Sequence, residues 1–148
     1  MSLATYLMPV WGGTEKYLVK ALQTMQNKAA RYVVNQSWYT PKRILLRQCG
    51  WLSMKQLIFY STALQVWKIL VFKTPSNLFS RFKLSNTRSR AENCLAIPTV
   101  QTNIAKNSFE VRAAVIWNTI PSDIRNTNGI KSFKKRLKSW IAENVDLD

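Results

Sequence analysis

The sequence predicts a mainly α-helical protein, a small bundle of about five helices with an irregular basic loop segment. Apolar residues recur every three or four positions in several stretches, which is the spacing of one helix face. Residues that cap or end helices stand at the borders of those stretches. Of the 148 residues, 47% are hydrophobic, which is enough to build a core, and the length fits one domain, or one domain with an appendage.

The first expected helix follows an apolar stretch, residues 1–11, that is broken by Gly12 and Gly13. Thr14 is expected to cap this helix, which runs to about Val34. Its apolar residues share one face and predict a seam that packs on the core: Leu18, Leu22, Met25, Ala29 and Tyr32. Basic residues lie opposite this seam or on its flank: Lys16, Lys20, Lys28 and Arg31.

The second and third expected helices are separated by a single glycine, Gly50, that ends the shorter one. Thr40 is expected to cap the shorter helix, and Pro41 suits its first turn, where a missing N–H costs nothing. The longer helix starts with a capping box of Ser53 and Gln56. It runs to about residue 72, and it is apolar on so many sides that it is expected at the centre of the bundle. Three tryptophans in apolar helical contexts are expected in the core: Trp51, Trp67 and Trp117.

Residues 75–107 are the least regular part of the chain. The run of Ser, Asn and Thr at 85–93 is typical of a loop, whereas residues 95–100 fit a short extended segment. A flexible basic loop can follow a phosphate backbone. The basic residues of this segment are therefore candidate nucleic-acid contacts, although plain solubility explains them equally well: Arg81, Lys83, Arg88 and Arg90.

Residues 108–148 predict two helices around a Pro-Ser-Asp turn. Ser108 is the expected N-cap of the first helix, which Asn118 and Pro121 end, and the second helix begins near Lys131. The apolar residues of the second helix share one face: Ile130, Phe133, Leu137, Trp140 and Ile141. Four lysines share another face, which is either merely solvated or a binding surface: Lys131, Lys134, Lys135 and Lys138.

The charge and the rare residue types narrow the class of protein. A net charge of +15 and a pI near 10.3 favour polyanionic partners, nucleic acid first and an acidic membrane surface second. There is no histidine, and Cys49 and Cys94 are the only cysteines, so a four-ligand zinc site is excluded and lone thiols of an intracellular protein are expected. Both nucleus and cytoplasm remain open. No stretch has the length of a membrane span, and no secretory signal is expected.

No catalytic constellation is apparent, so we expect no enzyme activity, no cofactor and no metal. Template-directed polymerisation needs paired aspartates that hold two metal ions, and none of the seven acidic residues stands in such a setting. A Ser/His/Asp or Cys/His set is impossible without histidine. Neither a P-loop nor a dinucleotide-binding glycine motif is present.

Four short motifs, in matching order, resemble the region that follows the polymerase palm in reverse transcriptases of non-LTR (LINE-type) retrotransposons. They are Val10-Trp11-Gly12-Gly13, then Gln26-Asn27-Lys28-Ala29-Ala30-Arg31, then Gly50-Trp51-Leu52-Ser53, and finally Trp117-Asn118 and Pro121 with Ile124, Arg125, Ser132, Phe133, Lys134, Leu137 and Lys138. The resemblance begins after the palm, so no catalytic residue is carried over. It implies a thumb-like helical part at 1–74, an irregular basic linker at 75–107 and a C-terminal helical hairpin with a basic amphipathic helix at 108–148.

The resemblance and the charge together predict a non-catalytic nucleic-acid-binding fragment or derivative of such a reverse transcriptase. It would hold template RNA or an RNA–DNA duplex through phosphate contacts. The expected contact residues are the two basic clusters and two residues of the first helix: Arg81, Lys83, Arg88, Arg90, Lys131, Lys134, Lys135, Lys138, Lys28 and Arg31. Candidate aromatic side chains for stacking on bases are Trp38, Tyr39 and Trp140, although core or interface packing is favoured for Trp140.

Two alternatives use the last helix differently. In one, the chain is a basic structural or interaction subunit of a larger assembly, and the face of Phe133, Leu137 and Trp140 docks on a protein partner. In the other, the last helix binds a membrane surface peripherally.

Overall fold

The computed structural model describes residues 8–13, 16–85 and 93–145. These residues are mainly helical and contain no β-strand, which confirms the predicted fold class. Five helices have at least seven residues: α3 (Lys16–Val34), α4 (Lys42–Cys49), α5 (Met54–Phe72), α8 (Phe109–Thr119) and α10 (Ile130–Asn144). Four shorter helices have four residues each: α2 (Met8–Trp11), α6 (Ser76–Phe79), α7 (Asn103–Lys106) and α9 (Ser122–Arg125).

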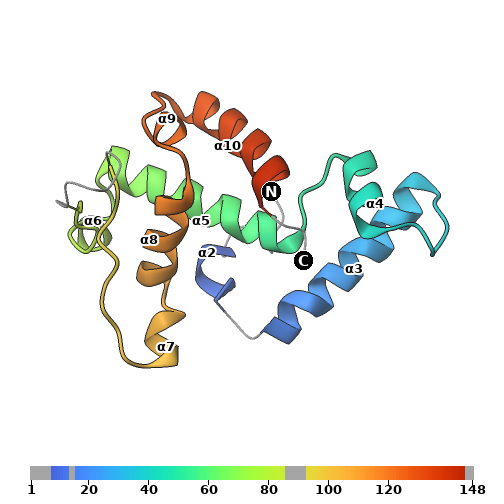
Figure 1. Cartoon of the computed structure of the whole chain (residues 1–148), viewed down its shortest axis with the longest axis horizontal. Coiled ribbons are helices and arrows are strands. Elements are labelled where there is room, and N and C mark those ends of the chain that lie inside the picture. Colours follow the sequence, from blue (N-terminus) through green and yellow to red (C-terminus); the bar gives the residue numbers. More distant parts are fainter. Residues whose placement is uncertain (1–7, 14–15, 86–92, 146–148) are drawn as a thin grey trace.

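Helix α5 lies at the centre of the bundle, as its sequence predicts. It contacts α2, α3, α6, α8 and α10, so its buried residues lie on several of its sides. Figure 1 shows α8 at a steep angle to α5, α10 running beside α5, and the hairpin of α3 and α4 projecting away from the N-terminal end of α5. A helix that is apolar all round is stable only when neighbours cover every side, which is why α5 organises the fold.

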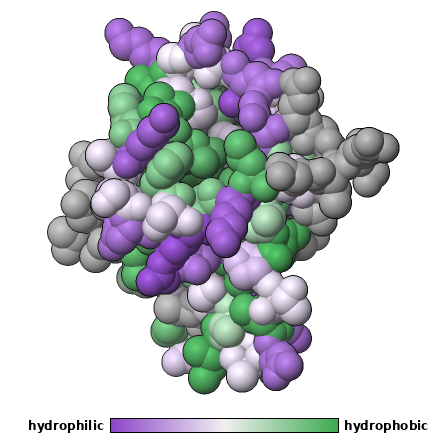
Figure 2. Space-filling model, turned by 90° about the vertical axis from the view of Figure 1, so that its left-hand side faces the viewer, coloured by the Kyte–Doolittle hydropathy of each residue, from purple (hydrophilic) through white to green (hydrophobic). Residues whose placement is uncertain are grey.

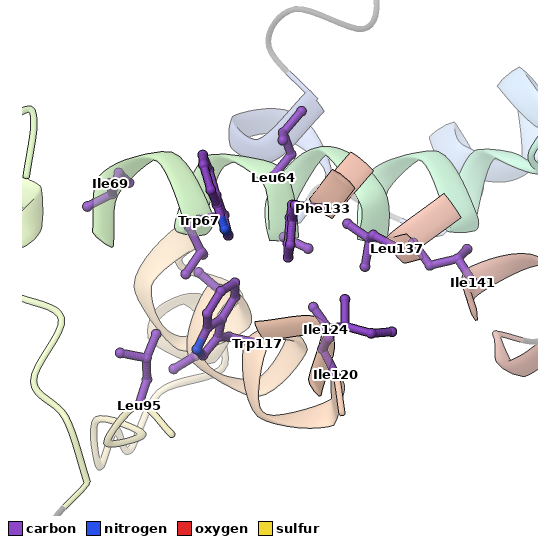
Figure 3. Close-up of a cluster of buried hydrophobic side chains, with 14 of the residues drawn as sticks. Leu64, Trp67, Ile69, Leu95, Trp117, Ile120, Ile124, Phe133, Leu137 and Ile141 are labelled. Atoms are coloured by element: carbon purple, nitrogen blue, oxygen red, sulfur yellow. The ribbon is translucent and has the colours of Figure 1, made fainter. Parts of the chain in front are cut away.

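One hydrophobic core joins α5, α8, α9 and α10 to the irregular segment (Figure 3). At its centre the ring of Phe133 stacks on Trp67, with centroids 5.5 Å apart, and lies 6.1 Å from Trp117. Phe82 and Leu95 bring residues 75–107 into the same core. The core therefore contains residues from all three segments predicted from the sequence, 1–74, 75–107 and 108–148.

The predicted capping box at the start of α5 is present and also holds the last helix. The Ser53 hydroxyl accepts from Gln56 N–H, and Gln56 Oε1 accepts from Ser53 N–H at 3.0 Å. Gln56 Nε2 then donates to the carbonyls of Val145, at 2.9 Å, and Ile141, at 3.3 Å. One buried amide thus satisfies backbone groups at the start of α5 and at the end of α10.

Helix α2 is fastened to α8 by Arg112. Its guanidinium donates to the carbonyl oxygens of Pro9, at 2.8 Å, and Asn107, at 3.0 Å. Burial lowers the pKa of Arg112 below its usual value.

The two glycines after α2 are required because other parts of the chain approach their backbone closely. A Cβ at Gly13 would lie 2.6 Å from the Asn107 carbonyl oxygen, and one at Gly12 would lie 2.7 Å from the Met8 carbonyl oxygen.

The predicted core seam of α3 is wrong. Leu18, Met25 and Tyr32 are exposed, Tyr32 by 88%. The inward face instead combines the fully buried Ala30 with glutamines. Gln26 Nε2 donates to the Leu52 carbonyl at 2.8 Å, and Gln23 Oε1 accepts from Met54 N–H at 2.8 Å. Amide hydrogen bonds to the start of α5 position this helix, and the apolar stripe faces outward.

Smaller differences concern helix ends and one tryptophan. Gly50 ends α4 in the left-handed conformation, as expected, but the N-cap of α4 is Pro41 rather than Thr40. Ser108 is the N-cap of α8 by position, although its side chain makes no capping hydrogen bond. The expected cap Thr14 lies outside the described residues.

Trp67 and Trp117 are buried, whereas Trp51 is 40% exposed and is not in the core.

Candidate nucleic-acid interface

Four lysines of α10 form one stripe, which we name the α10 lysine face: Lys131, Lys134, Lys135 and Lys138. Lys134 is half-buried, and the other three are exposed. Helical spacing puts Lys131, Lys135 and Lys138 on the side away from the fully buried Phe133 and Leu137. Lys134 lies at the edge of this face, next to the buried Ile141. In the described part of the chain, the structure records no ion pair at these lysines. The apolar side of α10 packs in the core, and Gln56 donates a hydrogen bond to the Val145 carbonyl at its end. These contacts fix the position of the helix that carries the lysine face.

The apolar side of α10 is largely covered by the rest of the chain. Phe133 and Leu137 are buried within the chain, and Trp140 packs on Phe59 of α5 with ring centroids 5.9 Å apart. The docking surface of the first alternative is therefore occupied by the protein's own core. The same burial removes the apolar surface that peripheral membrane binding through this helix would need.

The second predicted basic cluster consists of Arg81, Lys83, Arg88 and Arg90, and the structure does not show it as a group of four unpaired cations. Arg81 forms an ion pair with Glu110 of α8, so much of its charge is already compensated. Lys83 is exposed nearby in the chain, and Arg88 and Arg90 lie outside the described residues. Of this cluster, the structure describes one unpaired cation, Lys83.

Lys28 and Arg31 lie on α3, at a distance from the α10 lysine face. Figure 1 shows α3 and α4 projecting away from the rest of the bundle. Lys28 is exposed, whereas Arg31 is half-buried and its Nε has no hydrogen-bond partner among the described residues. These two residues therefore extend a basic surface onto the hairpin instead of completing one continuous site.

The hairpin carries further groups that nucleic acid could contact. Trp38 and Tyr39, in the loop between α3 and α4, are 73% and 83% exposed, and their rings lie 5.7 Å apart. Arg43 and Arg47 of α4 are exposed, and sequence reasoning assigned neither of them. The available signal was the absence of any acidic residue between Glu15 and Glu92, a span that contains fourteen lysines and arginines.

A cavity of about 810 Å³ opens between the end of α5, α6, the 82–84 segment and α9. Its apolar wall includes Trp67, Leu70, Phe79, Phe82 and Trp117, and its polar wall includes Lys73, Lys83, Asn93, Arg125 and Asn126. Figure 2 faces this end of the molecule and shows apolar surface with hydrophilic side chains around it. The residues come from separate parts of the chain, so the sequence gives no signal that they lie together.

Arg125 is the unexpected residue of this cavity. It is only 6% exposed, and its Nη1 donates to the Asn93 carbonyl at 3.1 Å and contacts Cys94 Sγ at 3.0 Å. Its Nε is buried and has no hydrogen-bond partner among the residues that the structure describes. The Asn93 carbonyl also accepts from Trp117 Nε1 at 2.9 Å, so one backbone oxygen positions both the arginine and the tryptophan.

The described residues contain no group of three or more His, Cys, Asp or Glu side chains placed to hold a metal ion. Cys49 and Cys94 are free thiols. None of the helices that the structure describes is long and apolar enough to cross a membrane. Comparisons of the chain with protein-family models, with curated proteins and with solved structures found no match.

Proposed function

We propose that this chain binds nucleic acid without catalysing a reaction, and that it holds RNA or an RNA–DNA duplex through phosphate contacts. The observation that supports the proposal most directly is the α10 lysine face: four cations on one side of a helix whose other side is fixed in the core. The resemblance to the post-palm region of LINE-type reverse transcriptases supports the same role. We accordingly expect the chain to act inside the cell, in the nucleus or the cytoplasm.

Phosphate contact fits this face better than base readout. Lysine is a flexible point charge that suits a phosphate backbone, whereas base recognition uses planar groups that pair bidentately with base edges. Lys131 and Lys138 are seven residues apart, which is about 10 Å along a helix at 1.5 Å per residue. A duplex presents one negative charge per roughly 1.7 Å of its axis, so several phosphates lie within that length.

A matched pair of double variants tests the assignment. Lys131→Gln with Lys138→Gln removes two charges from the α10 lysine face, and Lys55→Gln with Lys106→Gln removes two exposed charges from other helices. Fluorescence anisotropy with a labelled RNA–DNA duplex should show a weaker complex for the first double variant than for the second. Equal weakening would mean that net charge alone attracts the duplex, and it would contradict a site on α10.

A second candidate function is favoured by the exposed stripe of α3. This stripe presents exposed apolar surface at Leu18, Met25, Tyr32 and Val33. The helix Lys16–Val34 has basic residues and no acidic one, so charge complementarity selects a protein partner with an apolar helix face flanked by acidic residues. In this form the chain is an interaction subunit that docks through α3 instead of α10.

Photo-crosslinking in cells distinguishes this candidate. A photoreactive amino acid at position 25 should give an adduct with an acidic protein, identified by mass spectrometry and lost when Leu18→Asp is added. The same amino acid at position 106, an exposed site on α7, is the control. Adducts with nucleic acid or with a second copy of this chain at position 25 would contradict it.

A further inference from the structure

We propose that the cavity beside Arg125 binds a nucleotide, either free or at the phosphorylated end of a strand. The inference rests on the proposed function only in its choice of ligand, which is a component of nucleic acid. The site itself is separate, because none of the α10 lysines lines the cavity.

Among the described residues, no acidic side chain is recorded beside the buried cation of this cavity, Arg125. Arg125 is only 6% exposed, and its recorded neighbours Asn93 and Cys94 offer a carbonyl oxygen and a thiol. Its Nε has no hydrogen-bond partner in the part of the chain that the structure describes. A buried charge that is not paired is destabilising, and a bound anion would offset that penalty. Such an uncompensated guanidinium in a cavity wall therefore points to an anionic ligand.

Two more cations line the cavity, and none of its described lining residues is acidic. Lys73 and Lys83 are exposed and line the same cavity as Arg125. A phosphomonoester carries a charge of about −1.5 to −2 near pH 7, so three cations can compensate it. Lys73 also lies 6.0 Å from the centroid of the Phe79 ring, which keeps its ammonium group close to the aromatic wall.

The rest of the lining suits the planar part of a nucleotide. Phe79, Phe82, Trp67 and Trp117 form an aromatic wall, and aromatic side chains are the usual stacking partners of bases. Side-chain amides also line the cavity, and Asn93 Nδ2 donates to Asn126 Oδ1 at 2.6 Å. The volume of about 810 Å³ lies within the ordinary range of small-ligand pockets. An anionic group, an aromatic body and hydrogen-bonding edges together describe a nucleotide.

The test is titration of the full chain followed by NMR at the tryptophan indole N–H groups. We expect 5′-AMP to shift the signals of Trp67 and Trp117, and a 5′-phosphorylated oligonucleotide to do so if the site takes strand ends. Adenosine and inorganic phosphate should each bind at least about tenfold more weakly, because each lacks one half of the ligand. Equal binding of adenosine, or of phosphate alone, would overturn the proposal, as would the absence of any shift with 5′-AMP.

Three variants separate this site from general charge attraction. Lys83→Gln and Arg125→Lys should each weaken 5′-AMP about tenfold, the loss expected for one charge-assisted hydrogen bond. Lys106→Gln, which removes an exposed charge outside the cavity, should have no effect. If Lys106→Gln weakens binding as much as Lys83→Gln, the cavity is not the site. Because Lys83 is exposed, its replacement reports on the proposal even if Arg125→Lys fails to fold.

The two proposals can fail separately. Loss of duplex binding in the α10 double variant with 5′-AMP binding retained would place the two activities at different sites. A chain that binds 5′-AMP but no 5′-hydroxyl duplex would refute backbone binding and leave the nucleotide site standing.

Discussion

At the scale of single residues, Gln56 shows what local sequence can predict and what it cannot. The capping box with Ser53 was predicted because its two partners stand three positions apart. The bonds from the same amide to the carbonyls of Ile141 and Val145 join residues 85 and 89 positions apart, and no local pattern encodes them. Arg125 is similar, since its burial depends on Asn93 and Cys94, which are more than thirty positions away in the chain.

Replacing Gln56 should therefore cost more than replacing a surface glutamine. We predict that Gln56→Ala lowers the free energy of unfolding by about 1–3 kcal/mol, because buried backbone groups at both helix ends lose their partner. The exposed Gln48→Ala is the control and should change it by less than about 0.5 kcal/mol. Denaturant unfolding measures both, and an equal effect of the two variants would contradict the role assigned to Gln56.

Tyr60 should make stability depend on pH in the alkaline range. Burial raises the pKa of Tyr60 above its usual value, so the folded state holds the phenolic proton more tightly than the unfolded state. Its contribution is complete below the unfolded pKa of about 10 and is lost as the pH rises through the folded pKa. We predict that the wild type loses stability relative to Tyr60→Phe as the pH is raised from 9 to 11.5. Parallel unfolding curves for the two proteins across that range would exclude this contribution.

At the scale of elements, a comparison of α3 with α10 shows the limit of helix periodicity. Periodicity predicted the buried face of α10 correctly and the buried face of α3 wrongly. Periodicity shows which residues share a face, but it does not show which face meets the rest of the bundle. In α10 the apolar face is buried, as predicted. In α3 the glutamine face is held by hydrogen bonds to the start of α5, which leaves the apolar face outside.

The two helices should consequently respond differently to polar or smaller side chains. We predict that Met25→Gln, on α3, changes the free energy of unfolding by less than about 0.5 kcal/mol, because Met25 is 66% exposed. Leu137→Ala, on α10, should lower it by about 2–5 kcal/mol, since that side chain is fully buried in the core. Chemical denaturation of both variants is the measurement, and a large loss with Met25→Gln would show that α3 packs through its apolar seam after all.

At the scale of the whole molecule, the sequence predicts the charge and the helical class but not the distribution of sites. A count of residues gives +15, and periodicity gives a helical bundle. Only the folded chain separates the α10 lysine face from Lys28 and Arg31, pairs Arg81 with Glu110, and gathers Lys73, Lys83 and Arg125 around one cavity. Those groupings depend on contacts between distant parts of the chain.

The most direct test of the central claim is the salt dependence of binding to an RNA–DNA duplex. Each phosphate contact should contribute about −0.9 to the slope of log K against log salt, the value for B-form DNA. The affinity of the wild type should fall by orders of magnitude between low and physiological salt, and the Lys131→Gln, Lys138→Gln double variant should reduce the slope by about two. An affinity that does not depend on salt, or no binding even at low salt, would contradict a phosphate-holding role for this protein.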